Sequence, residues 1–168
     1  LLNVINETRT QGMQLNAVKE SEFHGRWERM RSVMDSGASI IVIPPSVGKL
    51  YELTESAASR AGVQYQVANG DELPNLKEKF LPLFAREGTT RGMLAQVADV
   101  TMPLKSPRAL YATGHLVVLD GPDSFVLNKI TGEVNCMEDD GANYFLDTWI
   151  IPPEDLDRYS DPSFLGQP

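Results

Sequence analysis

The feature of this sequence that most restricts its fold is an apolar stretch, Ser32 to Pro45, which an acid interrupts. It reads SVMDSGASIIVIPP, so that Asp35-Ser36-Gly37 separates two apolar runs. The β-branched density of Ile40 to Ile43 favours a strand, and Pro44-Pro45 ends the segment. A carboxylate loses free energy when it leaves water, and Asp is almost never fully buried without a partner. An acid at this place therefore needs a structural or chemical reason.

Strand and turn signals continue along the chain. Val63, Tyr65 and Val67 alternate with polar residues ahead of Asn69-Gly70, which predicts a β-hairpin around residues 68–71 with a type I′ turn. Two further strands are predicted within residues 80–100, joined by a turn near Glu87-Gly88, and Pro82 favours an edge position for the first of them. Three more strands are predicted within residues 115–120, 124–129 and 143–151.

Helix signals are few. Ser106 is suited to cap a helix, Pro107 to occupy its first position and Gly114 to follow its end, so one short helix is predicted here. Residues 48–62 are ambiguous between a loop and a short helix. The fold class predicted from these patterns is all-β.

The length of 168 residues suits one domain with tails. We expect an N-terminal arm at residues 1–22, a domain at 23–151, and an acidic, proline-rich tail at 152–168 without a fold of its own. No apolar run approaches the length of a membrane span, and no signal-peptide pattern is present. Position 1 is not Met, which suggests a processed piece of a longer product.

Composition excludes several kinds of partner and cofactor. The formal net charge of −8 argues against a nucleic-acid partner, since phosphate binding needs clustered Lys and Arg. Cys136 is the single cysteine and lies in no pattern of metal-ligand spacing, so neither a disulfide nor a metal site is predicted. A reducing, intracellular compartment is the default expectation. His24 and His115 are far apart in sequence, which favours surface or core roles.

The acid at position 35 fits a specific chemistry. Two carboxylates within hydrogen-bond reach share a proton, so that one acts as general base toward water and the other as general acid. Gly37 would let the backbone approach the acid closely, and Ser36 could fix its orientation by a hydrogen bond. Neither Asp99 nor Asp120 has an equivalent context. A second copy of Asp35, supplied by a symmetric homodimer, would complete the pair.

Several blocks of the sequence together resemble a known family. In order, VMDSGAS, GVQYQVANGDELPNL, AQVADVTMPLKSPRALYATGHLVVLD and ITGEVN with NYFLDTW are similar to the retropepsin-like aspartic protease segment of copia-type and related protist retrotransposon polyproteins. The resemblance covers roughly Trp27 to Ile151. It implies a small closed β-barrel, a homodimer, one catalytic Asp per chain, and a β-hairpin flap over a peptide or polyprotein substrate. It implies no metal and no organic cofactor.

The resemblance assigns roles to particular residues. Asp35, Ser36 and Gly37 match the catalytic triplet. The substrate-binding flap would contain the residues Gln66, Val67, Ala68, Asn69 and Gly70. Two lysines depart from the pattern: Lys105 puts a cation where the family packs a side chain under the active site, and Lys77 stands where Gly is usual.

A second function remains open on the sequence. A catalytically inactive, co-opted domain of the same fold would serve as a structural or binding subunit of a larger multiprotein complex, because fold does not fix function. Asp71, Glu72 and Asp99 are explained by a hairpin tip and a solvated strand face. Trp27 and Trp149 are predicted to be packing residues, with a subunit interface as the alternative.

Overall fold

The computed structural model describes residues 27–159. The predicted arm at 1–22 and the last nine residues of the predicted tail lie outside the described residues. The elements are β1 (Glu28–Met34), β2 (Val42–Ile43), α2 (Ala57–Arg60), β3 (Gln64–Gln66), β4 (Glu72–Pro74), β5 (Lys77–Ala85), β6 (Thr90–Val97), β7 (Leu104–Lys105), α3 (Pro107–Ala112), β8 (His115–Val118), β9 (Phe125–Asn128), β10 (Val134–Cys136), β11 (Glu138–Asp139), β12 (Tyr144–Ile150), η1 (Pro153–Asp155) and α4 (Leu156–Tyr159).

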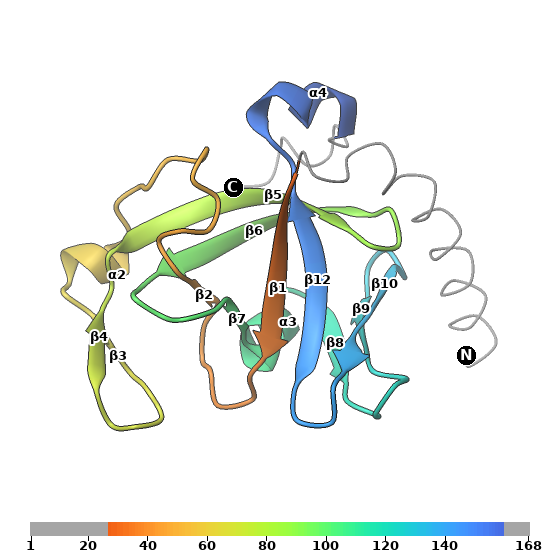
Figure 1. Ribbon diagram of the computed structural model, residues 1–168, viewed down its shortest axis with the longest axis horizontal. Helices are drawn as coiled ribbons and strands as arrows, with labels where there is room; N and C mark the ends of the chain where they lie inside the picture. The colour runs from red at the N-terminus through yellow and green to blue at the C-terminus, as the bar shows by residue number, and fades with distance from the viewer. Residues whose placement is uncertain (1–26, 160–168) are drawn as a thin grey trace.

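Six of these strands form a closed barrel. Their order is β1-β7-β2-β6-β5-β12, and β12 pairs back with β1 in an antiparallel register from Glu28↔Ile150 to Val33↔Phe145. Figure 1 shows β1 and β12 side by side, with the longer strands β5 and β6 forming the other wall. The predicted all-β closed barrel is therefore confirmed.

The core of the barrel follows from the two-residue repeat of its strands. In β6, Met93, Ala95 and Val97 are buried, whereas Leu94 between them is 54% exposed. The buried side chains of this core are Met30, Ile43, Leu81, Leu83, Met93, Ala95, Val97 and Ile150. They come from β1, β2, β5, β6 and β12, so the core joins strands that are distant in sequence.

A three-stranded sheet, β10-β9-β8, and helix α3 form a second unit of structure next to the barrel. Val126 of β9 belongs to a buried cluster with Met34 of β1 and Leu146 of β12. This cluster connects the second unit to the barrel. β10 and β11 were not predicted, because each has only three or two residues and is defined by pairing with a neighbour.

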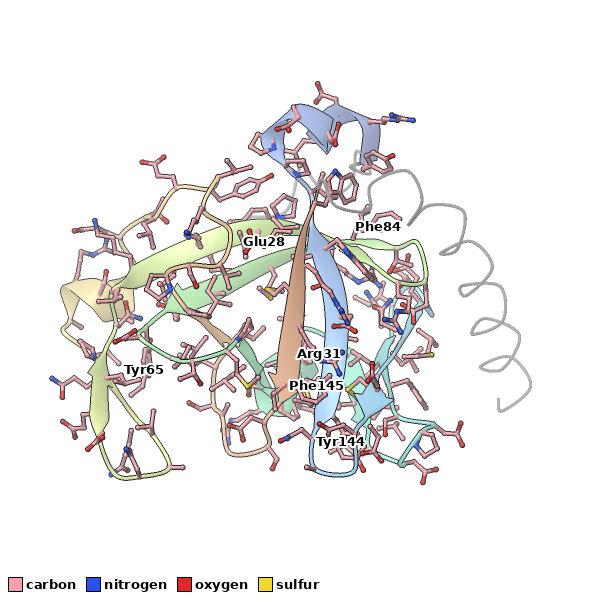
Figure 2. All side chains as sticks on the ribbon, in the orientation of Figure 1. Glu28, Arg31, Tyr65, Phe84, Tyr144 and Phe145 are labelled. Carbon is pink, nitrogen blue, oxygen red and sulfur yellow. The ribbon has the colours of Figure 1, made fainter. Side chains whose placement is uncertain are left out.

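An ion-pair cluster ties three chain segments together at the barrel wall. The carboxylate of Asp147 on β12 accepts hydrogen bonds from Arg29 (2.7 Å), Arg31 (2.9 Å) and Arg86 (3.2 Å). Asp147 has a side chain only 4% exposed, and the guanidiniums supply the partners that a buried acid needs. Figure 2 labels Arg31 beside Phe145, whose ring centroid lies 4.1 Å from the guanidinium carbon.

The edge position predicted for the strand with Pro82 is wrong. β5 lies between β6 and β12 in the sheet. Proline is tolerated there because the registered pairs between β5 and β12 end at Leu83↔Ile150. Pro82 lies one residue beyond this last pair, where the missing N–H breaks no registered pairing with β12. The Pro82 carbonyl still accepts a bond from the Ile151 N–H at 3.0 Å.

The helix prediction at Ser106 is confirmed, but it is not the one helix of the described chain. Ser106 accepts a hydrogen bond from the Ala109 N–H, Pro107 begins α3, and Gly114 follows with φ +85°. The ambiguous segment contains α2, and η1 and α4 follow β12. No helix among residues 27–159 is long and apolar enough to span a membrane.

Residues 152–159, the described part of the predicted tail, contain η1 and α4 and pack on the domain instead of forming a fold of their own. Tyr159 packs edge-on against Trp27 with ring centroids 4.7 Å apart, and Trp27 Nε1 donates to Asp155 Oδ2 at 2.8 Å. Trp27 and Trp149 are both 6% exposed and belong to one cluster with Phe84, which confirms their packing role. Aromatic burial therefore orders a segment that its composition marks as irregular.

Candidate functional site

Asp35 lies directly after β1, in a turn and not inside a strand. The apolar stretch is thus two strands, β1 and the short β2, with residues 35–41 between them. Ile40 and Ile41 were predicted to continue the second strand, but they lie outside it. The carboxylate therefore stays half-exposed. This explains how an acid can stand in a stretch of such apolar character.

The Asp35 turn is held by the neighbouring strand β7. β7 lies between β1 and β2, parallel to the first and antiparallel to the second. The Asp35 N–H donates to the Lys105 carbonyl at 2.9 Å, and the Ser106 hydroxyl donates to the Ala38 carbonyl at 2.6 Å. The Ala38 N–H donates to the Asp35 carbonyl at 3.1 Å. These bonds fix the backbone on both sides of the carboxylate.

The carboxylate itself is oriented by Gly37. The Gly37 N–H donates to Asp35 Oδ1 at 2.8 Å. A Cβ at position 37 would lie 3.2 Å from the same oxygen, so a larger residue would press on the acid. The close approach expected for this glycine is confirmed. Ser36 is exposed and does not orient Asp35 through its hydroxyl among the described residues, so the backbone does this instead.

No second carboxylate of the described chain is hydrogen-bonded to Asp35. Between residues 27 and 159, Asp35 makes no hydrogen bond or ion pair with another acidic side chain. Asp99 and Asp120, whose sequence contexts do not match that of Asp35, are exposed and lie in other loops. A proton-sharing pair of carboxylates would need a second copy of the chain.

The predicted hairpin is present, but its turn is of another type. The Gly70 N–H donates to the Val67 carbonyl at 2.9 Å and the Val67 N–H donates to the Asp71 carbonyl at 2.9 Å. The loop therefore has three residues, of which only Gly70 has a positive φ, +89°. A type I′ turn would require positive φ at Asn69 as well, so that prediction is wrong. The pattern is that of a type I turn followed by a left-handed glycine.

The hairpin residues predicted to bind substrate lie apart from the acid in this chain. Gln66, Ala68, Asn69 and Gly70 are exposed, and Val67 is half-buried. Figure 1 shows the β3–β4 hairpin and the loop after β1 extending toward the same side of the molecule. No hydrogen bond among the described residues joins the two. Asp35, Ser36 and Gly37 thus lie in one turn, and the hairpin residues lie apart from that turn.

Lys105 is a buried cation whose backbone contacts the Asp35 turn. The residue is only 6% exposed, and burial lowers the pKa of its ammonium to about 8, with a further lowering by the charge of Arg91. Lys77, the other lysine that departs from the pattern the sequence resembles, is half-buried at the start of β5. The sequence marks Lys105 as unusual, because a lysine in an apolar segment has few ways to be solvated.

His115 is a half-buried residue near Lys105 that sequence reasoning assigned no function. Its Nδ1 lies 3.2 Å from the Leu110 carbonyl and 3.1 Å from Thr113 Oγ1. Burial lowers its pKa, against the opposing effect of the bond to Leu110. Nothing in the local sequence indicated that His115, Arg91 and Lys105 would lie near one another, because they come from β8, β6 and β7.

No group of three or more His, Cys, Asp or Glu side chains within residues 27–159 is arranged to hold a metal ion. Cys136, the single cysteine of the sequence, is half-buried in β10.

No family model matches this chain, and comparisons with curated proteins and with solved structures find no match either.

Proposed function

We propose that this protein is an aspartic endopeptidase that works as a homodimer, with one Asp35 from each copy. The observation that supports this most is the state of the Asp35 carboxylate. It is half-exposed, Oδ1 is held by the Gly37 N–H at 2.8 Å, and Oδ2 has no hydrogen-bond partner among the described residues. An oriented carboxylate with one free oxygen is suited to proton transfer.

The chemistry requires the two acids to differ in protonation. The ionised Asp35 takes a proton from a water molecule, whose oxygen then attacks the peptide carbonyl carbon. The protonated Asp35 of the other copy donates its proton to the carbonyl oxygen. Collapse of the tetrahedral intermediate breaks the C–N bond: the leaving amine takes the proton of the first Asp35, and a hydroxyl proton of the intermediate returns to the second Asp35, which restores the singly protonated pair. The two titrations belong to the pair and not to either residue.

The backbone of the site supports this role. A proton-sharing pair is sensitive to the separation of its oxygens, so each acid must be fixed by its own chain. The bonds from Asp35 to Lys105 and from Ser106 to Ala38 supply such fixation. A twofold axis next to the turn would bring the same surface of a second copy against it.

The substrate class is an extended peptide, as in a polyprotein. A peptide in this conformation can add hydrogen bonds to exposed backbone, while alternate side chains enter pockets. All of the hairpin residues 66–70 except the half-buried Val67 are exposed, and the hairpin protrudes from the barrel, which suits a cover over such a peptide. On this proposal the hairpin approaches Asp35 when substrate is bound.

The decisive variant is Asp35→Asn. Asparagine can still accept the Gly37 N–H bond, so the fold should persist, but it cannot take or give the proton. We expect cleavage of a peptide library at mildly acid pH to fall by roughly 10⁴-fold or more. Asp99→Asn, an exposed acid in the loop after β6, is the matched control and should keep wild-type activity.

The homodimer is tested separately by light scattering at the concentration of the cleavage assay. The proposal predicts a dimer in the wild type and in both variants. Equal cleavage by wild type and Asp35→Asn would overturn the assignment. A folded monomer without cleavage would also overturn it, and would leave the second function, a binding subunit of a larger complex.

A further inference from the structure

A cavity of about 710 Å³ lies between the barrel and the second unit of structure. Its walls come from β5, β6 and β12 on one side and from α3, β8, β9 and β10 on the other. This volume is within the range of small-molecule sites. Asp35 and the hairpin residues 66–70 do not line it, so it is separate from the proposed catalytic site.

The walls of the cavity are largely apolar. Leu83, Val126 and Leu146 line it and are each at most 6% exposed. The cavity reaches the surface at an apolar opening, because Ile130 and Leu94 also line it and are 86% and 54% exposed. Burial of an apolar body against these walls would be favourable, because it removes apolar surface from water.

Two cations of the lining have unused hydrogen-bond donors. The Lys105 side chain lines the cavity, the residue is 6% exposed, and its ammonium has no hydrogen-bond or ion-pair partner among the described residues. Nη2 of Arg91 is buried and also lacks a hydrogen-bond partner. An unpaired buried cation is costly, so a site of this kind is completed by an anion.

The balance of charge in the lining indicates one negative charge on the ligand. The titratable residues among the described lining are Arg91, Lys105, His115 and Glu133. Nη1 of Arg91 is paired with Glu133 Oε2 at 2.5 Å, which cancels one positive charge. Burial and the charges of Arg91, Lys105 and Lys129 lower the pKa of His115, so it is neutral at pH 7. The net charge of the lining is then about +1, from Lys105.

We propose that this cavity binds an amphiphilic monocarboxylate, a molecule with one carboxylate and an apolar body, such as a medium-chain fatty acid. The carboxylate pairs with the Lys105 ammonium and with Nη2 of Arg91. The apolar body lies against Leu83, Val126 and Leu146 and extends toward Ile130. This is a binding function in addition to peptide hydrolysis, and it needs no second copy of the chain.

The test compares ligands of one chain length and different head groups by calorimetry at pH 7. Octanoate should bind the wild-type chain at least tenfold more tightly than 1-octanol, and octylammonium should bind most weakly. Carboxyl-labelled [¹³C]octanoate should show a shifted resonance when bound, since the carboxylate leaves water for a paired site.

Variants separate the cation from the apolar walls. Lys105→Met keeps the shape of the side chain and should weaken octanoate at least tenfold while leaving 1-octanol unchanged. Ala109→Phe fills the cavity from α3 and should weaken both ligands. Lys49→Met, an exposed lysine away from the cavity, is the control and should bind octanoate as the wild type does.

Three results would overturn the proposal. One is the absence of octanoate binding to a wild-type chain that circular dichroism shows to be folded. Another is equal affinity for octanoate and 1-octanol. The third is unchanged octanoate affinity in a folded Lys105→Met variant. None of these results would bear on the Asp35 assay, so the two proposals fail independently.

Discussion

At the scale of single residues, Lys105 contacts the Asp35 turn with its backbone and the cavity with its side chain. Its carbonyl accepts the Asp35 N–H, whereas its side chain lines the cavity. This is possible because the backbone hydrogen bonds of a strand lie in the plane of the sheet, whereas its side chains project out of that plane. Burial of the ammonium is the cause of its lowered pKa, about 8 in place of 10.5. The charged form of Lys105 therefore lowers the free energy of unfolding.

We predict that Lys105→Met is more stable than the wild type at pH 7, without ligand, by at most about 3 kcal/mol. Between pH 8 and 10.5 the unfolded chain binds more protons at this lysine than the folded chain does. The stability of the wild type relative to the variant therefore rises through that window, and the full penalty applies below pH 8. Urea unfolding at pH 7, 8.5 and 10 measures the difference. A difference that stayed constant across these pH values would contradict the lowered pKa.

At the scale of elements, helix α3 and the Asp35 turn share one residue. Ser106 caps α3 through the Ala109 N–H and donates to the Ala38 carbonyl. The cap was predictable, because it depends on residues next to each other in sequence. The bond to Ala38 was not, since it spans 68 residues. The helix was therefore predictable from the sequence, but its role in positioning the candidate site was not.

We predict that Ser106→Ala lowers the free energy of unfolding by about 2 kcal/mol, from the lost cap and the unpaired carbonyl. Hydrogen exchange at Gly37 and Ala38 should become faster. The matched control is Ser56→Ala, which removes the cap of α2 and should cost about 1 kcal/mol. Exchange at Gly37 and Ala38 should not change in the control; equal acceleration in both variants would show that Ser106 does not hold the turn.

At the scale of the whole molecule, the two ends of the described chain close the barrel and cover it. β1 pairs with β12 across more than a hundred residues, and the segment after β12 returns to pack on Trp27. Tyr159 contacts both Trp27 and Phe84, with ring centroids at 4.7 Å and 6.0 Å. The described part of the tail is therefore part of the folded domain, whose boundary does not fall at residue 151.

We predict that Tyr159→Ala destabilises the protein by about 1 to 2 kcal/mol, because its edge-on aromatic contacts are lost. Tryptophan fluorescence should shift to longer wavelength as Trp27 gains access to water. Tyr111→Ala removes a tyrosine that is 69% exposed and should change stability by less than about 0.5 kcal/mol. An unchanged unfolding midpoint in Tyr159→Ala would show that the segment adds nothing to the fold.

The features that depend on near neighbours in the chain were predictable from residue types alone. The all-β class, the cap at Ser106, the hairpin at Asn69-Gly70 and the close fit of Gly37 to Asp35 each follow from residues a few positions apart. Steric limits on the backbone and short-range hydrogen bonds operate at this distance. They leave a record in residue type that can be interpreted without a structure.

Tertiary structure alone decided what distant segments do to one another. It placed Pro82 on an interior strand, folded residues 152–159 onto Trp27, and gathered Arg91, Lys105 and His115 around one cavity. The physical reason is that solvation, ion pairing and strand partners depend on proximity in space. Barrel closure sets that proximity, and local sequence patterns do not report it.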